Sequence, residues 1–273
     1  MVKTIQKSIM PLKETWWVVT DLDGTLMDHN YDISPAIDTL YWLEDIGIPV
    51  IPCTSKTAAE VENFRAEFGL RDPYIVENGG AVYGNNPITS IPWELALGRT
   101  HDNLRPLLDR LSKDIGYQLR ALEDIPYVEI ENLTGLKGKA IDQACDRKWS
   151  VPFLNPPVRD LIRLNQLANK LEATIVQGNR MCHLLGIGSH KGRAVNELKK
   201  FLHKPEAKII ALGDSPNDLP LLEVADISIV VPNKDGPHHS YLKNIQQDQF
   251  LLAPEPHSAG WAKAVRNCIN QLQ

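Results

Sequence analysis

The sequence predicts an α/β protein with a Rossmann-like parallel sheet and an α+β cap inserted into it. Strand-like apolar runs alternate with helical patterns near both ends of the chain, which is the arrangement of βαβ units. Between 86 and 185 the pattern changes to longer polar helices and paired strands. We therefore expect a core domain formed by 16–85 and 186–273, an inserted cap at 86–185 and an N-terminal tail at 1–15.

The first part of the core begins with Trp16 to Thr20, an apolar and β-branched run with the length of a buried parallel strand. Ser34 and Pro35 then predict a helix start, because serine is a common cap and proline suits the first helical position. Gly47 ends this helical pattern. The further elements expected here are a strand at 48–53, a helix at 57–68 closed by Gly69, and a short strand at 74–76.

The same alternation resumes after the cap. The expected elements are a helix from about Lys191 to Leu202, a strand at 207–212, a helix at 218–224 and a strand at 227–231. Within the cap, strands at 173–177 and 180–185 flank Gly178-Asn179, a two-residue link suited to a hairpin turn with positive φ. The two separated stretches of core sequence are thus expected to complete one sheet.

Composition and charge argue against several classes of protein. The chain is 43% hydrophobic and 23% charged, which is ordinary for a globular protein with a buried core. Its net charge of -5, with both signs interspersed, gives no field that would draw it to nucleic acid or an anionic membrane. The four cysteines lack C-x-x-C spacing, and the apolar stretch before Lys13 is too short for a signal peptide or anchor. We therefore expect a cytoplasmic protein with reduced thiols.

The first candidate site is a pair of acids directly after the first strand, in Asp21-Leu22-Asp23-Gly24-Thr25. Alternation along an extended chain places both carboxylates on one side. They follow the end of a parallel strand, where open α/β sheets bind ligands, and two crowded acids need a cation such as Mg²⁺ to stay ionised. The alternatives are a solvated acidic turn and an EF-hand, but an EF-hand requires a third acidic ligand before its glycine.

A second acidic loop, Gly213-Asp214-Ser215-Pro216-Asn217-Asp218, again joins a strand to a helix. Asn217 alone can be explained as a helix cap. Capping does not explain Asp214 and Asp218 together with the first acidic pair. Four aspartates on two strand ends of one sheet therefore predict a divalent metal site formed by Asp21, Asp23, Asp214 and Asp218.

Two further segments carry groups that suit an anion. Lys191 begins a predicted helix, where a cation opposes the helix dipole unless an anion is bound beside it. Thr54-Ser55-Lys56 follows the second strand, and its hydroxyls suit either helix capping or hydrogen bonds to phosphoryl oxygens. A lone lysine at a helix start is otherwise a solvated surface charge. A functional role for Lys191 is favoured because the predicted sheet can bring this residue near the aspartates.

In chain order, the sequence resembles the four motifs of the haloacid dehalogenase superfamily of phosphatases. These are D-L-D-G-T at Asp21, T-S at Thr54, the helix-starting Lys191 and G-D-x-x-N-D at Gly213. The insertion between the second and third motifs resembles the α+β cap of the sugar-phosphatase branch of that superfamily. The resemblance implies the hydrolase core of this superfamily with an inserted substrate-specificity domain.

Shorter strings in the core and the cap resemble the mannosyl-3-phosphoglycerate phosphatases and the similar glucosyl-3-phosphoglycerate phosphatases. They are C-T-S-K-T at Cys53, E-N-G-G at Glu77, L-T-G-L at Leu133, R-x-x-S-x-P-F from Arg147 and G-N-R-M-C-H-L-L-G from Gly178. Where that family has S-E-P-F, this chain has Val151 in place of the glutamate. The loss of this carboxylate implies weaker discrimination between glucose and mannose, and we lean towards the glucosyl ester.

The resemblance also implies a role for each matching residue. Asp21 would be the nucleophile and Asp23 the general acid, while Thr54 and Lys191 would cradle the phosphoryl oxygens. Mg²⁺ would be held at Asp21, Asp23 and Asp214, with Asp218 orienting the site. The residues expected to contact the rest of the substrate are Ser55, Lys56, Asn78, Gly79, Gly80, Arg147, Arg180 and His183.

The activity implied is Mg²⁺-dependent hydrolysis of glucosyl- or mannosyl-3-phosphoglycerate through an aspartyl-phosphate intermediate. The expected partner is therefore a small phosphorylated glycosylglycerate or sugar phosphate, with no nucleic acid and no membrane. The alternatives are a sucrose-phosphate or general sugar-phosphate phosphatase, a phosphomutase, and a non-catalytic metal-binding protein on the same scaffold. The oligomeric state is left open by the sequence.

Overall fold

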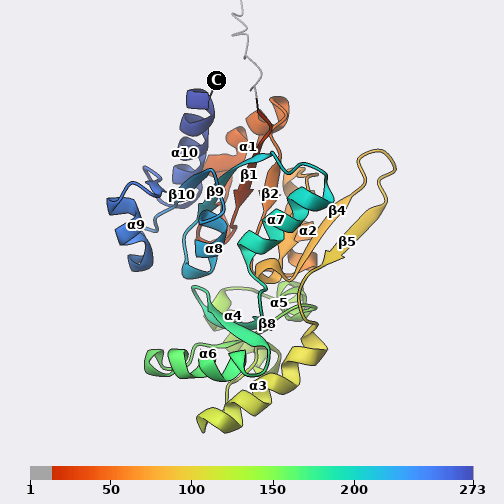
Figure 1. Cartoon of the computed structure of the whole chain (residues 1–273), viewed down its shortest axis with the longest axis vertical. Coiled ribbons are helices and arrows are strands. Elements are labelled where there is room, and N and C mark those ends of the chain that lie inside the picture. The colour runs from red at the N-terminus through yellow and green to blue at the C-terminus, as the bar shows by residue number, and fades with distance from the viewer. Residues whose placement is uncertain (1–13, 273) are drawn as a thin grey trace, which may run out of the picture.

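The computed structural model describes residues 14–272, and its core contains a five-stranded, all-parallel sheet (Figure 1). The expected N-terminal tail at 1–15 lies outside the described residues except for its last two. In sheet order the strands are β11 (Leu251–Leu252), β10 (Ile227–Val230), β9 (Lys208–Gly213), β1 (Trp16–Thr20) and β2 (Val50–Pro52). Strand β1, which lies between β9 and β2, is buried throughout.

Strand β1 joins the two stretches of core sequence. On one side Val18 pairs with Val50 of β2, and on the other side it pairs with Ile210 of β9, which follows the cap in the sequence. The prediction of one parallel sheet built from both ends of the chain is therefore confirmed. Because both neighbours are parallel to β1, the three strands end at the same edge of the sheet.

Helices cover both faces of this sheet. Successive residues of β1 face opposite sides, so Val18 belongs to one apolar cluster and Val19 to the other. The first cluster is closed by α1 (Ile37–Asp45), α2 (Ala58–Phe68) and α10 (His257–Leu272). The second is closed by α7 (Lys191–Phe201), α8 (Leu219–Leu222) and α9 (Leu242–Gln246). No helix within 14–272 combines the length and apolar character needed to cross a bilayer.

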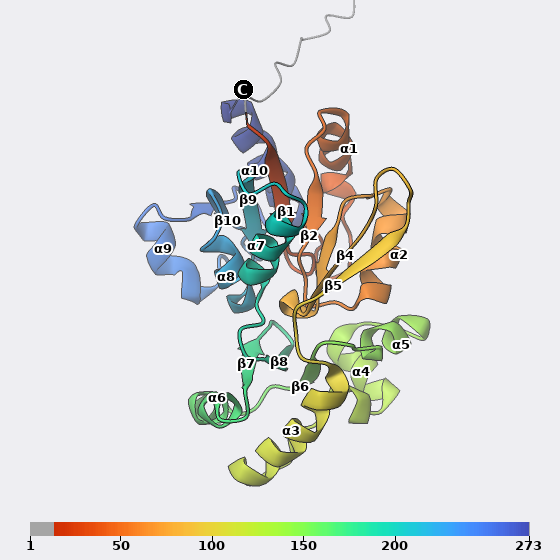
Figure 2. The same cartoon turned by 45° about the vertical axis from the view of Figure 1, so that its right-hand side comes forward.

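A second, antiparallel sheet is formed by β3 (Tyr74–Val76), β4 (Ala81–Asn85) and β5 (Pro92–Ala96). Figure 2 shows the β4–β5 hairpin projecting beyond α2 and away from the cap. The expected cap boundary at 86 falls inside this hairpin. Because β5 pairs with β4 and Leu95 packs against a core cluster, we propose that the cap begins after Gly98.

The inserted segment forms its own α+β unit below the core in Figure 1. Its sheet has the order β6 (Val151–Leu154), β8 (Met181–Gly186) and β7 (Ala173–Gln177), all antiparallel. Its helices are α3 (His101–Ile115), α4 (Tyr127–Thr134), α5 (Lys139–Cys145) and α6 (Leu161–Asn169). A separate apolar cluster that includes Leu108, Phe153 and Leu184 packs between its sheet and helices.

Three local predictions were wrong. Ser34 does not cap a helix, because its hydroxyl hydrogen-bonds to Asp32 and it opens a short 3-10 turn instead. Gly178 and Asn179 do not adopt positive φ: the N–H of Gly178 donates to the carbonyl of Met181, which moves the turn one residue along the chain. The cap of the helical turn after β9 is Ser215 rather than Asn217.

Candidate active site

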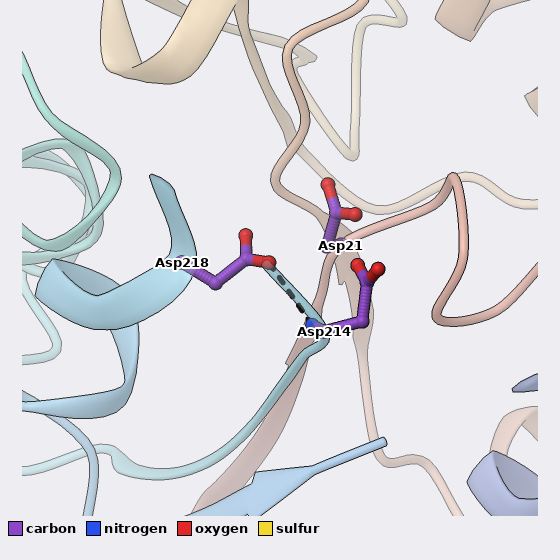
Figure 3. A group of neighbouring side chains, drawn as sticks. All are labelled: Asp21, Asp214 and Asp218. Atoms are coloured by element: carbon purple, nitrogen blue, oxygen red, sulfur yellow. Dashed lines mark hydrogen bonds between the residues drawn. The ribbon is translucent and has the colours of Figure 1, made fainter. Parts of the chain in front are cut away.

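Three aspartates converge where β1 and β9 end (Figure 3). Asp21 directly follows β1, Asp214 directly follows β9, and Asp218 lies in the helical turn after it. Each offers a carboxylate oxygen within 4.8 Å of the others, and all three side chains are buried. In Figure 3 the carboxylates of Asp21 and Asp214 lie next to each other, while Asp218 reaches back to the Asp214 backbone. These residues form the floor of the site.

Lys191 connects two members of this floor. Its Nζ lies 2.6 Å from Asp21 and 2.5 Å from Asp218, and its side chain is completely buried. Burial alone would lower the pKa of Lys191, but the charges of Asp21 and Asp218 raise it above its ordinary value. The ammonium therefore stays charged inside the protein. Although Lys191 is the first residue of α7, it is a buried ion-pair partner and not a surface cation.

Burial and mutual repulsion disfavour the ionised forms of the aspartates on the floor. Burial raises the pKa of Asp21 well above its ordinary value, despite the nearby charge of Lys191. Burial, together with the charge of Asp218, raises the pKa of Asp214 to about 7. Asp218 has no free oxygen, since one accepts from Lys191 and the other from the N–H groups of Asp214 and Ser215. Its geometry suits a group that anchors the loop.

The remaining donors fit a hard divalent cation. Within residues 14–272 the close group of carboxylates comprises Asp21, Asp214 and Asp218, whereas the carboxylate of Asp23, predicted as a fourth member, pairs with Lys56 at 3.0 Å. Asp214 accepts hydrogen bonds from Thr25 at 3.1 Å and from Asn179 at 2.8 Å, and both partners are neutral. Carboxylate oxygens are the ligands that Mg²⁺ prefers, and a cation would offset the repulsion between Asp21 and Asp214.

Gly24 is required by the close approach of the two loops. Its φ of +87° lies in the left-handed region, and a Cβ atom there would lie 2.5 Å from a carboxylate oxygen of Asp214. Any larger residue would displace that carboxylate. The glycine of the D-L-D-G string therefore has a steric role in shaping the floor.

Beside the floor, the loop after β2 supplies hydroxyls and a cation. Ser55 and Lys56 line the main cavity, whereas Thr54 is fully buried beneath it and its hydroxyl accepts from the Lys56 N–H at 3.2 Å. The ammonium of Lys56 lies 3.0 Å from Asp23 and 3.4 Å from Glu60. Burial opposes its charge, but these two acids raise the pKa of Lys56 above its ordinary value. Lys56 is thus paired with the predicted general acid.

The cap closes the site with the turn between β7 and β8. Asn179 donates to Asp214, and Arg180 donates to the Tyr31 hydroxyl at 2.9 Å. Tyr31 in turn donates to the carbonyl of Thr134 in α4 at 2.8 Å, so one core residue joins two parts of the cap. These contacts enclose a cavity of about 250 Å³ whose lining includes Asp21, Asp23, Lys56 and Arg180.

Two other cap residues predicted to bind substrate also line this cavity. Arg147 is held in place, since its guanidinium donates at 2.6 Å both to the Ala144 carbonyl and to the Ser55 carbonyl. Burial, and then the charge of Arg147, lowers the pKa of His183 to about 3. His183 is therefore a neutral, polar part of the wall.

Three predicted substrate contacts, Asn78, Gly79 and Gly80, lie behind this cavity instead. Asn78 accepts a hydrogen bond from Asn217 at 3.0 Å. A Cβ atom on Gly79 would lie 2.4 Å from a backbone oxygen, and one on Gly80 would lie 2.3 Å from the Trp149 side chain. Gly79 thus permits close packing against His190 at the start of α7 within the core, and Gly80 permits close packing against the base of the cap.

Val151 also faces away from the cavity. It is fully buried in the apolar cluster of the cap, while the next residue, Pro152, lines the cavity from the other face of β6. The expectation that Val151 removes a hydrogen-bond acceptor from the sugar site was therefore wrong.

Sequence reasoning missed three residues that join the cap to the core. Asn179 and Tyr31 do so at the mouth, as described above. Glu77 is almost fully buried at the hinge and accepts hydrogen bonds from the Lys148 N–H, the Trp149 N–H and the Ser150 hydroxyl. The sequence did contain a signal for Glu77, because this glutamate of the E-N-G-G string directly follows an apolar strand. Tyr31, with a φ of +65°, gave no such signal.

Comparison with known proteins agrees with this geometry. A family model described as haloacid dehalogenase-like hydrolase matches residues 18–97 and 159–248. A glucosyl-3-phosphoglycerate/mannosyl-3-phosphoglycerate phosphatase from Persephonella marina is 31% identical over 269 residues, covering 94% of this chain and 98% of the relative. A protein of the same name from Methanococcoides burtonii is 30% identical over 268 residues, covering 93% of this chain and 97% of the relative. A crystal structure from Thermoplasma acidophilum superposes with a TM-score of 0.71 at 21% identity, covering 95% of this chain and all of that one.

Proposed function

The chain belongs to the haloacid dehalogenase-like hydrolases and is a phosphoric monoester hydrolase; from this premise we propose that it hydrolyses a glycosyl-3-phosphoglycerate in a Mg²⁺-dependent reaction. The names of the two relatives support this substrate class. The observation that carries the proposal is that cations from both core and cap, Lys56, Arg147 and Arg180, line one cavity with the Asp21 floor. Such a cavity suits an ester that carries a second negative group besides its phosphate.

We assign the covalent chemistry to Asp21. One of its oxygens forms a bond to phosphorus while the bond from phosphorus to the alcohol oxygen of the substrate breaks. Asp23 gives its proton to that leaving oxygen. It then takes a proton from a water molecule, whose oxygen bonds to phosphorus and releases phosphate and the free Asp21 carboxylate.

The other floor residues position and neutralise the reacting groups. Lys191 holds one oxygen of Asp21, which leaves the second oxygen free to face phosphorus. Asp218 holds Lys191 and the Asp214 loop in place. Mg²⁺, held by Asp21, Asp214 and the Asp23 backbone carbonyl, would supply positive charge that lets an anionic nucleophile approach an anionic ester.

The wall of the cavity would recognise the glycerate carboxylate. Arg180 is the favoured partner, because its side chain hydrogen-bonds to the neutral hydroxyl of Tyr31 and packs 5.7 Å from the centre of that ring. Among residues 14–272, no acid forms a salt bridge with Arg180. Lys56, at 5.0 Å from the same ring, is already paired with Asp23 and Glu60 and suits phosphate binding better. Binding energy from the carboxylate can align the phosphate for attack.

Steady-state kinetics test the substrate class. We expect kcat/KM for glucosyl- and mannosyl-3-phosphoglycerate to exceed that for glucose 6-phosphate, sucrose 6-phosphate and 3-phosphoglycerate by about 100-fold or more. Arg180→Met should reduce kcat/KM for the glycosylglycerates about tenfold or more and leave glucose 6-phosphate nearly unchanged. Arg159→Met, at an exposed cap position, is the matched control. Equal turnover of the simple esters, or an equal effect of Arg180→Met on both classes, would refute the proposed substrate.

A further inference from the structure

A second and larger cavity, of about 1130 Å³, lies beneath the β4–β5 hairpin. Its lining includes Trp17 near the start of β1, Pro49 just before β2, and Trp93 in β5. Asp21 lies beyond the other end of β1, so this cavity and the active site open at opposite ends of the parallel strands. Residues of the β4–β5 hairpin, which Figure 2 locates, contribute to its lining, among them Asn86 and Pro92. We refer to it as the hairpin cavity.

A buried arginine in the wall of this cavity forms no salt bridge with an acid among the residues that the structure describes. Arg65 is only 9% exposed, and its Nε has no hydrogen-bond partner among residues 14–272. Its guanidinium packs 4.4 Å from the centre of the Tyr74 ring. Burial lowers the pKa of Arg65, while the nearby groups Tyr74, Asp72 and Glu62 act in the opposite direction.

The acids near Arg65 are engaged by other donors. Glu62 accepts a hydrogen bond from the Tyr74 hydroxyl at 2.9 Å, and Asp72 accepts one from the Val50 N–H at 2.9 Å. Both acids line the same cavity as Arg65. A buried guanidinium is normally paired with an acid or with several oxygen acceptors. Arg65 therefore retains donors for an acceptor that enters the cavity.

The other walls favour a flat apolar body. Trp93 lines the cavity, and its ring packs against that of Phe201 with a centroid separation of 4.6 Å, whereas Trp17 is only 2% exposed and lies beneath them. Two further cations, Arg71 and Lys204, are exposed at the lining and would attract an anion towards it. The planar guanidinium of an arginine matches a carboxylate through two parallel hydrogen bonds. The lining carries three cations and two acids, and this net single positive charge suits a carboxylate better than a phosphate dianion.

We propose that the hairpin cavity is a binding site for a small organic carboxylate with a planar apolar body, whose carboxylate pairs with Arg65. The aromatic side chains beneath the hairpin contact the flat body. This site is separate from the phosphatase centre, and its occupancy does not depend on the identity of the phosphatase substrate.

Isothermal titration calorimetry with 2-naphthoate tests the site, with neutral 2-naphthamide as the comparison ligand. We expect naphthoate to bind the wild-type protein at least about tenfold more tightly than naphthamide. Arg65→Met should weaken naphthoate binding by about tenfold or more and remove the preference for the anion. Arg266→Met is the matched control, because Arg266 also packs on an aromatic ring of the core, 4.9 Å from the centre of Trp42.

A second variant keeps the test valid if Arg65→Met unfolds the protein. Ala66 is exposed on α2 and lines the hairpin cavity next to Arg65, so Ala66→Trp places a bulky side chain in this part of the cavity while leaving Arg65 in place. It should abolish naphthoate binding and leave phosphatase activity unchanged. Absence of naphthoate binding to the wild-type protein would overturn the proposal. Binding that survives both Arg65→Met and Ala66→Trp would also overturn it, because the ligand would then occupy another place such as the active site.

Discussion

The floor and the cap wall of the candidate active site are held in position by different parts of the fold. On the floor, Asp21, Lys191 and Asp218 are buried and bonded to one another within the core. On the wall, Asn179 and Arg180 belong to a turn of the cap, and their side chains are held against the core by hydrogen bonds to Asp214 and Tyr31. The floor is therefore complete once the core folds, whereas the wall exists only when the cap is seated. Changes on the floor should affect the chemical step most, and changes on the wall should affect recognition and closure.

The largest effect is expected on the floor, from Asp21→Asn. A neutral amide is a poor nucleophile for phosphorus and a weak ligand for Mg²⁺, so kcat should fall by about 1000-fold or more. The melting temperature should not fall, because burial disfavours the charge that the variant removes. Phosphate-release assays and thermal unfolding measure the two effects, with Asp102→Asn at an exposed position as the control. A folded variant with more than about 5% of the activity would show that Asp21 is not the nucleophile.

A smaller effect is expected where the wall meets the floor, from Asn179→Ala. The variant removes the 2.8 Å hydrogen bond between the cap turn and Asp214. We expect kcat/KM to fall about 10- to 100-fold, the range for losing a hydrogen bond to a charged group, without loss of stability of the core. Asn169→Ala, at an exposed position of α6, is the control for the kinetic assay. Unchanged kinetics would mean that this contact does not help to seat the cap during turnover.

The smallest effect is expected within the wall, from His183→Gln, and it concerns stability. Burial lowers the pKa of His183 to about 3, so below its ordinary value of 6.5 the unfolded chain binds a proton that the folded chain does not. Stability should therefore decrease as the pH falls below 6.5. Between pH 7 and pH 5.5 this one group should cost about 1 kcal/mol, and His183→Gln should remove that contribution. Urea unfolding at the two pH values measures it; equal losses in both proteins would show that His183 is protonated in the folded state.

The sequence predicted the floor better than the wall for a physical reason. Strand alternation and the two acidic loops predicted that Asp21 and Asp214 follow neighbouring strands. In a parallel sheet, the residues that directly follow adjacent strands must lie close together. The wall depends on how the cap docks, which no local pattern encodes. Tyr31 and Arg180 meet across a separation of 149 residues, and Gly79 and Gly80 serve packing rather than recognition. Strings shared with a family identified these glycines, but they did not indicate on which side of the cavity the glycines lie.

The position of β1 between β2 and β9 also affects how the protein is made. During synthesis β2 emerges soon after β1, but β9 emerges only after the whole cap. The cap is continuous in sequence and has its own apolar cluster, so it can fold while the core is still incomplete. Until β9 leaves the ribosome, one edge of β1 is unpaired, and an unpaired apolar strand is a site for aggregation. The chain is therefore most prone to aggregate during translation, before β9 and the strands that follow it have been synthesised.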